Sequence, residues 1–295
     1  MQDGILSIQS AVAYGHVGNS AAVFPLQRLG FEVWPVNTVL FSNHTGYGAW
    51  RGRVVGLDWV EEIIEGIADR GAVPRTRAVL SGYLGDASLG EAVLRVVARV
   101  RAARADMLYA CDPVMGDEGR GFFVRPDIPE FFRDHAVPTA DIVTPNQFEL
   151  GWLAGCEITG LEDALAAAAA VRAKGPTIVV CTSLDVGSPE ELGILAHSAE
   201  ASWLCRTPRL PIALNGTGDA FTALFLGYWL KTGDLAATLT RTVSAMFALV
   251  QATHDAGSRE LVLVGAQDEL LAPKRIFEAA RVDGRSRGGA DWKPA

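Results

Sequence analysis

The chain is poor in cysteine and histidine. Its 295 residues include 4 cysteines and 5 histidines. The cysteines stand far apart in apolar or strand-like surroundings and form no CxxC pair, so the sequence favours neither a zinc knuckle nor a disulfide framework. No two histidines stand at metal-ligand spacing, which argues against a zinc centre. Scattered free thiols are typical of a reducing compartment, and we expect a cytoplasmic protein.

Positive charge is also scarce. The chain has 26 Lys and Arg against 34 Asp and Glu, a net charge of −8. Nucleic-acid binding rests on dense cationic contacts with phosphates, so we expect no nucleic acid among the partners. The N-terminus lacks a basic and apolar leader, and no apolar run reaches membrane-spanning length. We therefore expect no membrane partner.

No linker rich in Pro, Gly or Ser interrupts the middle of the chain, and no segment repeats. We expect one domain over residues 1–282, followed by a flexible tail at 283–295, where Gly, Arg and Ser dominate. Strand-like and helix-like segments alternate, which predicts an α/β fold with a mostly parallel sheet covered on both faces. The predicted strands are 4–10, 31–40, 78–81, 107–111, 142–144 and 177–181, with a hairpin of 192–197 and 201–207. The predicted helices are 18–29, 57–70, 88–104, 147–154, 162–174, 218–231 and 235–254.

Polar segments follow the predicted strands. They are residues 9–10, 42–47, 81–83, 112–117, 144–149 and 182–183. Because ligands of open parallel sheets bind beyond the carboxyl ends of the strands, we expect these segments to converge on one site. One such loop would mean little, whereas six at consecutive strand ends predict a functional edge.

A glycine turn, Gly216-Thr217-Gly218-Asp219, precedes an apolar helical segment. The glycines let the backbone approach a ligand closely, and the free N–H groups of a helix start attract anions. Asp219 is poorly suited to a site that only binds phosphate. It suits a base that takes a proton from a hydroxyl attacking a phosphoryl group. The alternative is an acid favoured by the helix dipole, with the glycines as turn residues.

Three acids and an amide form the second group of candidates. Asp112 and Asp117, with phosphate oxygens, would suit Mg²⁺, which needs few protein ligands. Asp117 could equally cap an exposed turn, and Glu149 could be an acid placed by a helix dipole. Asn146 could be a helix N-cap rather than a nucleotide contact.

These residues carry a family resemblance that covers nearly the whole chain. The chain resembles the pyridoxal kinases of the ribokinase-like superfamily. The glycine turn is common to many kinases of that superfamily, whereas the blocks at 14–22 and 41–47 are more specific to pyridoxal kinases. The matching motifs are YGHVGNSAA at 14–22, FSNHTGY at 41–47, SGY at 81–83, CDPVMGD at 111–117, DIVTPNQFE at 141–149 and GTGD at 216–219. The resemblance implies a single-domain, three-layer sandwich without a separate lid domain, and a homodimer.

The resemblance also implies ATP-dependent phosphorylation of the 5′-hydroxymethyl group of pyridoxal, and of pyridoxine and pyridoxamine. Asp219 would be the base, and the N–H groups of Gly216, Thr217 and Gly218 would form the anion hole. The implied residues around the pyridine ring are Ser10, Val17, His44, Thr45, Gly46 and Tyr83. Of these, Ser10 and Thr45 would hydrogen-bond the ring nitrogen or substituents, and Val17 and Tyr83 would pack on the ring.

On the nucleotide side, the resemblance implies ATP, Mg²⁺ and a monovalent cation, K⁺ or Na⁺. The residues implied for the metals and phosphates are Asp112, Asp117, Thr144 and Glu149. Those implied to contact ATP are Asn146, Thr182 and Ser183, with Thr207, Pro208, Arg209 and Leu210 along the nucleotide. Thr182 and Gly46 stand where some bacterial members carry Lys and Gln, which leaves the nucleotide contacts open. Residues 116–125 would form a flap over the phosphates.

Three other functions compete with this one. A hydroxymethylpyrimidine kinase also phosphorylates a hydroxymethyl group on a flat heterocycle. A sugar kinase has less support, because the loops contain aromatic residues and no lid is evident. A non-catalytic vitamin B6 binder is the alternative from outside the enzymes. The intact glycine turn argues against a binder, which needs no base at that position.

Overall fold

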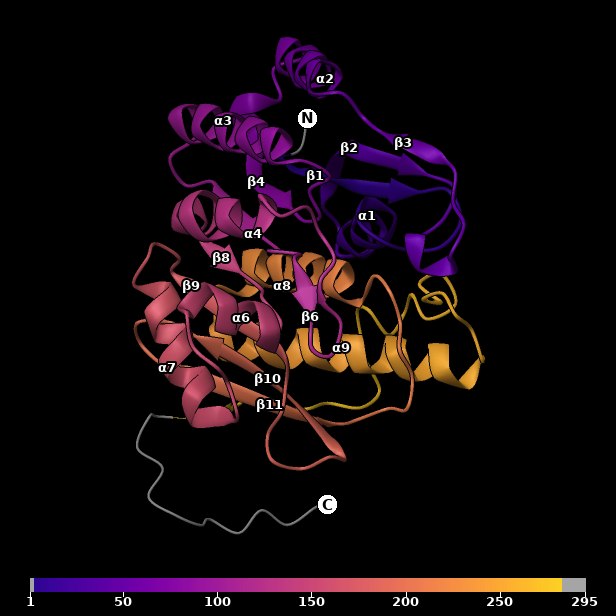
Figure 1. The fold of residues 1–295 in the computed structure, drawn as a ribbon, viewed down its shortest axis with the longest axis vertical. Coiled ribbons are helices and arrows are strands. Elements are labelled where there is room, and N and C mark those ends of the chain that lie inside the picture. Colours follow the sequence, from indigo (N-terminus) through magenta and orange to yellow (C-terminus); the bar gives the residue numbers. More distant parts are fainter. Residues whose placement is uncertain (1–2, 283–295) are drawn as a thin grey trace.

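One ten-stranded sheet runs through the computed structural model, which describes residues 3–282 (Figure 1). The strand order is β12-β11-β10-β9-β8-β5-β4-β1-β2-β3. The strands are β1 (Gly4–Val12), β2 (Glu32–Phe41), β3 (Gly52–Val54), β4 (Thr76–Ser81), β5 (Leu108–Cys111), β8 (Ile142–Val143), β9 (Ile178–Leu184), β10 (Glu191–His197), β11 (Ser202–Pro208) and β12 (Ala280–Arg281). The strands from β2 to β9 in this order pair in parallel, and antiparallel strands flank them at both edges. The predicted mostly parallel sheet is confirmed.

The helices cover both faces of the sheet (Figure 1). They are α1 (Asn19–Arg28), α2 (Leu57–Asp69), α3 (Ala87–Ala103), α4 (Ile128–Phe131), α5 (Val137–Thr139), α6 (Gln147–Ala154), α7 (Leu161–Arg172), α8 (Thr217–Thr232) and α9 (Leu235–Asp255). Helices α2, α3, α4, α6 and α7 contribute to one hydrophobic core, and α1, α8 and α9 to the other. This is the three-layer sandwich that the resemblance implied.

Alternating side chains of the central strands feed the two cores. In β4, Val79 belongs to the core under α2 and α3, whereas Ala78 and Leu80 belong to the core under α8. A strand points successive side chains to opposite faces, so a strand that is buried on both faces is apolar throughout. The β-branched run of β9 shows the same division.

Helix α9 is long and apolar enough, by length and composition, to cross a membrane. The sequence-based prediction that no segment reaches that length was therefore wrong. The buried side of α9, which includes Leu239, Val243 and Leu249, belongs to the core shared with α1 and α8. Core helices of globular proteins can have this length and composition too, so the finding is weak evidence for a membrane span.

Several predicted boundaries need correction. Strand β1 continues past Ser10 to Val12, with a register shift between Gln9 and Ser10, and β9 continues through Thr182 and Ser183. These polar residues therefore lie inside strand ends rather than after them. Polar residues at these strand ends interrupt the apolar pattern, so the pattern stops before the backbone pairing does.

The sequence analysis missed the short elements. These are β3, β12, the helical run from α4 through the π-helical turn η3 (Phe132–Ala136) to α5, the 3₁₀ turns η1 (Thr45–Tyr47) and η2 (Val73–Arg75), and the hairpin of β6 (Gly116–Asp117) and β7 (Gly121–Phe122). Elements of two to five residues are too short to show a period. Within residues 3–282, β6 and β7 are the only strands outside the main sheet, so this part contains no separate lid domain. The tail predicted at 283–295 lies outside the described residues.

Candidate active site

The carboxyl ends of the parallel strands and the N-terminus of α8 lie at the same edge of the sheet. Gly216 precedes α8 with φ +82°, and a Cβ at this position would overlap the carbonyl oxygen of His16. Only glycine combines this backbone angle with so close an approach. Gly216 caps α8 without a side chain. The first N–H groups of the helix are therefore available to an anion, as the sequence predicted.

Asp219 lies in the first turn of α8 and is half-buried. Its Oδ1 lies 3.6 Å from the position that a Cβ on Gly82 would occupy. Burial raises the pKa of Asp219, and the Gly18 N–H acts in the opposite direction. A carboxylate with a raised pKa is a stronger proton acceptor than an exposed one.

Asp112, directly after β5, is a buried acid with an unpartnered carboxylate oxygen. Only 4% of the residue is exposed, and its Oδ2 finds no hydrogen-bond partner within the described part of the chain. A Cβ on Gly218 would lie 3.4 Å from that oxygen, so Asp112 faces the glycine turn. Burial, followed by the charges of Glu149 and Asp219, raises the pKa of Asp112 well above its usual range. Buried carboxylate oxygens in proteins normally have a partner, which makes this oxygen a candidate ligand for a cation.

Glu149 is buried and held by three backbone N–H groups. Its Oε1 accepts from Met115 at 2.8 Å and Gly116 at 3.4 Å, and its Oε2 accepts from Asn146 at 2.9 Å. Burial raises the pKa of Glu149 to about 7, while these N–H groups lower it. Three donors to one carboxylate fix its position tightly, so Glu149 ties α6 to the loop after β5.

Asn146 is the N-cap of α6. Its side chain accepts from the Glu149 N–H at 2.9 Å, which completes a capping box, and donates to the Gly116 carbonyl at 2.8 Å. The capping alternative for Asn146 is therefore confirmed. A contact between Asn146 and ATP stays a prediction.

Asp117 lies in the exposed hairpin of β6 and β7, which in Figure 1 runs beside α6. Its Oδ1 accepts from the Glu118 N–H at 2.9 Å, so it caps its own turn, while its charge also raises the pKa of Glu149. The hairpin also approaches His44 in the loop after β2. Burial and then the positive charge of Arg120 lower the pKa of His44. This hairpin is the flap segment that the sequence singled out.

The residues implied for the pyridine ring come from three loops, of which those of Val17 and Gly46 contact the glycine turn or its neighbour Asn215. Ser10 and Val17 are buried, Tyr83 and His44 are half-buried, and Thr45 and Gly46 are exposed. The backbone of Gly18 packs on Ser10, and a Cβ on Gly46 would lie 3.5 Å from Asn215 Nδ2. His44 accepts from the Gly46 N–H at 3.0 Å. The glycine turn thus contacts both the loop of Val17 and Asp112.

The nucleotide candidates are only partly brought together. Thr182 pairs with Asn146, and Ser183 has a positive φ of 55°, which is unusual for a residue with a side chain. The Thr144 hydroxyl lies 2.7 Å from that of Thr222. The remaining four, Thr207, Pro208, Arg209 and Leu210, lie at and beyond the end of β11. Their neighbours there are β10 and Glu190, so the structure does not join them to the acidic group.

Two further residues belong to the site although the sequence analysis did not select them. Thr222, one turn into α8, contacts Thr144, donates to the Gly218 carbonyl at 3.0 Å and lowers the pKa of Asp112. A lone polar residue inside an apolar helix was the available signal for it. Glu260 accepts hydrogen bonds from the loops that follow β1 and β2. An acid in a polar loop 41 positions after Asp219 carries no such signal.

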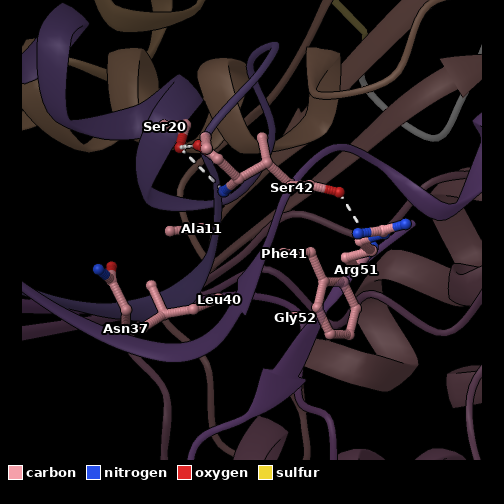
Figure 2. Close-up of a pocket in the computed structure, with 10 residues that line it drawn as sticks. Ala11, Ser20, Asn37, Leu40, Phe41, Ser42, Arg51 and Gly52 are labelled. Carbon is pink, nitrogen blue, oxygen red and sulfur yellow. Dashed lines mark hydrogen bonds between the residues drawn. The ribbon is translucent and has the colours of Figure 1, made fainter.

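A cavity of about 550 Å³ lies beside this site, between α1 and the strands β1, β2 and β3 (Figure 2). Figure 2 shows Ser42, which accepts from the Arg51 N–H, and Ser20, which bonds to the backbone of Val12. None of the predicted site residues lines this cavity. Its lining offers no carboxylate, whereas the candidate acids lie around Asp219.

Comparisons with known proteins identify the family of the chain. The family model described as phosphomethylpyrimidine kinase matches residues 36–260. The curated pyridoxal kinase PdxY of Rubrobacter xylanophilus is 57% identical over 94% of this chain and 97% of its own length. The PdxY of Deinococcus radiodurans is 54% identical over 95% and 96%. A solved pyridoxal kinase from Leishmania donovani in complex with ADP and pyridoxamine superposes with a TM-score of 0.90 at 30% identity, over 96% of this chain and all of its own.

The chain therefore belongs to the phosphomethylpyrimidine kinase family, whose members share this α/β architecture. Within it, identity above 50% over nearly the whole length groups the chain with the pyridoxal kinases.

Proposed function

We propose that the chain is an ATP-dependent pyridoxal kinase that phosphorylates the 5′-hydroxymethyl group of pyridoxal, and also that of pyridoxine and pyridoxamine. The observation that carries this proposal is the position of Asp219. It is half-buried in the first turn of α8, and the glycine turn before it contacts both the unpartnered Asp112 carboxylate and the His16 carbonyl next to Val17. The product would be pyridoxal 5′-phosphate, which places the chain in vitamin B6 salvage.

Phosphoryl transfer depends mostly on positioning and charge stabilisation. The acceptor hydroxyl attacks the γ-phosphorus of ATP, and the bond from that phosphorus to the bridging oxygen of ADP breaks. Asp219 takes the hydroxyl proton as the new P–O bond forms, because the hydroxyl is too weak an acid to ionise at neutral pH. The N–H groups of Gly216, Thr217 and Gly218 stabilise the negative charge on the transferring group.

The acids next to this turn fit a divalent cation. In our proposal Asp112, Asp117, Thr144 and Glu149 hold Mg²⁺, a monovalent cation (K⁺ or Na⁺) and the phosphates of ATP. The unpartnered Asp112 Oδ2 supports this fit. Among residues 3–282 no cluster of three His, Cys, Asp or Glu side chains is close enough to hold a metal alone. That agrees with Mg²⁺, which takes phosphate and water oxygens alongside one or two carboxylates. When bound, Mg²⁺ would neutralise charge on the phosphates.

The remaining site assignments belong to the same proposal. On the acceptor side, Ser10, His44, Thr45 and Gly46 contact the ring substituents, while Val17 and Tyr83 pack on the ring. The ATP contacts come from Asn146, Thr182 and Ser183, and from Thr207, Pro208, Arg209 and Leu210. We also propose a cytoplasmic homodimer without nucleic acid or membrane partners. Exposed Leu40, Trp50 and Val54 around the edge strand β3 support a subunit contact.

Steady-state assays with ATP and each candidate acceptor test the function. We expect turnover with pyridoxal, pyridoxine and pyridoxamine, and a much lower kcat/KM with hydroxymethylpyrimidine. Preference for hydroxymethylpyrimidine would instead favour the alternative function of a hydroxymethylpyrimidine kinase. Tight pyridoxal binding without turnover would favour a binding protein. Light scattering after size exclusion tests the dimer.

A further inference from the structure

Glu260 joins two loops that are far from it in the sequence. Its Oε2 accepts from the His16 backbone N–H at 2.9 Å, and its Oε1 accepts from the Tyr47 hydroxyl at 2.6 Å. His16 follows β1, and Tyr47 ends the turn η1 after β2. Each carboxylate oxygen thus holds a different loop.

The backbone that carries Glu260 is itself well fixed. The Ser258 hydroxyl donates to the Glu260 carbonyl at 2.6 Å and accepts from the Glu260 N–H at 3.1 Å. Leu261 is buried in the core under α8 and α9, and the Val262 N–H donates to Thr253 of α9 at 3.2 Å. The carboxylate therefore projects from a rigid support rather than from a free loop.

Close packing at Glu260 leaves the loops little freedom. A Cβ on Gly15 (φ +93°) would overlap the Glu260 carboxylate, so glycine is needed there for the contact. The guanidinium of Arg259 lies 4.5 Å from the centroid of the Tyr47 ring, over its face. Tyr47 is therefore held by a cation at its ring and by a carboxylate at its hydroxyl.

Both loops lead directly to the glycine turn. The His16 carbonyl is the group on which Gly216 packs, and Val17 is the next residue. The second loop carries His44, Thr45 and Gly46, and Gly46 lies beside Asn215. A shift at Glu260 would consequently move the acceptor side of the site relative to Asp219, while the acids on the nucleotide side have separate supports.

We propose that Glu260 is a positioning residue that fixes the two acceptor-binding loops against the catalytic turn and so determines affinity for pyridoxal rather than for ATP. This inference rests on the proposed function, because it takes the residues of those loops as the acceptor site. Glu260 itself does not touch the reacting atoms.

Steady-state kinetics of Glu260→Ala, Tyr47→Phe and the double variant test the proposal. Glu260→Ala should raise the KM for pyridoxal about 10-fold or more, and Tyr47→Phe about 3-fold, since each lost hydrogen bond costs a factor of this order. The KM for ATP should stay within about 2-fold. Tyr47→Phe should add nothing in the Glu260→Ala background, because its partner is already gone.

Two further variants separate positioning from general damage. Glu260→Gln can accept from the His16 N–H and donate to the Tyr47 oxygen, so it should restore most of the pyridoxal KM. Glu269→Ala is the matched control. Glu269 pairs with Lys274 near the same end of the chain, and within residues 3–282 it forms no hydrogen bond or ion pair with the loops of His16 and Tyr47. The kinetics of Glu269→Ala should equal those of the wild type. Thermal unfolding of each variant shows whether the fold is kept.

Two outcomes would overturn the positioning role and leave the proposed function standing, provided that the wild-type protein phosphorylates pyridoxal. One is an equal rise of the KM for pyridoxal and the KM for ATP in Glu260→Ala. The other is an additive effect of Glu260→Ala and Tyr47→Phe in the double variant. A wild-type protein that neither turns over nor binds pyridoxal, in a parallel calorimetric titration, would overturn the proposed function and with it the acceptor assigned to Glu260. If Glu260→Ala does not fold, Glu260→Gln and Tyr47→Phe decide: an unchanged pyridoxal KM in Tyr47→Phe refutes the role.

Discussion

Gly216 packs directly against the main-chain carbonyl of His16, so the turn that begins α8 rests on the loop that follows β1. The contact joins residues 200 positions apart in the chain. It requires glycine for two reasons, the positive φ and the absence of a Cβ. The position of the glycine turn thus depends on a neighbouring loop as well as on its own sequence.

Gly216→Ala should therefore reduce activity by far more than backbone strain alone would. We expect kcat/KM to fall by about 100-fold, because the turn must move away from His16 and misplaces the reacting groups. Gly233→Ala is the matched control: Gly233 ends the same helix with φ +62° and has open space where a Cβ would lie. It should lose about 1 kcal/mol of stability and keep its activity. Urea unfolding and kinetics measure both. Equal losses in the two variants would contradict the contact.

Asp219→Asn should slow turnover by about 100-fold or more while both KM values change little, since the amide keeps the shape but cannot take the proton. Steady-state rates at saturating ATP and pyridoxal provide the measurement. Asp234→Asn is a suitable control, because Asp234 only caps α9 through the Ala237 N–H and asparagine caps equally well. A wild-type kcat in Asp219→Asn would rule out its assignment as the base.

Asp117→Asn tests the metal role apart from the turn-capping role. The amide oxygen can still accept from the Glu118 N–H, so the turn should persist while the negative charge is lost. We expect the Mg²⁺ concentration for half-maximal activity to rise about 3-fold or more, in line with the loss of one charged contact. Glu118→Gln, which removes the adjacent exposed charge, should leave the Mg²⁺ titration unchanged. If both variants titrate like the wild type, Asp117 serves the turn alone.

The metal-free protein should lose stability as the pH rises through the range set by Glu149. Its pKa is about 7 in the folded chain against an ordinary 4.5, so the folded state binds this proton more tightly than the unfolded state. The contribution is complete below about pH 4.5 and is lost as the pH rises toward 7. The partly buried His16, His44 and His197, whose pKa values burial lowers, act in the opposite direction below pH 6.5.

A comparison with Glu149→Gln removes the histidine effect. The stability of the wild type relative to Glu149→Gln should decrease by on the order of 1–3 kcal/mol between pH 5 and pH 7.5, with EDTA present. The decrease belongs to the pair of Glu149 and Asp112, because each charge raises the energy of the other. Urea unfolding at the two pH values gives the difference. A constant difference would show that Glu149 is not protonated preferentially in the folded state.

Most of the main elements were predictable because apolar segments alternate along the chain with polar, Gly- and Pro-containing loops. The helix at 147–154 was predicted at its observed limits, and α8 and α9 to within a residue or so at each end. The short hairpin of β6 and β7 was not, since two-residue strands have no period and depend on α6 for support. Glu260 was missed for a similar reason: its importance comes from what it contacts.

The residue types along the chain were sufficient to predict the kind of site. Glycines at 216 and 218 followed by Asp219, together with acids and amides at successive strand ends, already indicated a phosphoryl-transfer edge on a parallel sheet, because backbone freedom, charge and strand periodicity are properties of neighbouring residues. The relations between distant residues required the folded chain. Asp112 became an unpartnered carboxylate, Gly216 a contact of His16, and Glu260 a support for two loops only when packing brought their elements together, since burial and hydrogen-bond partners depend on contacts that no local pattern encodes.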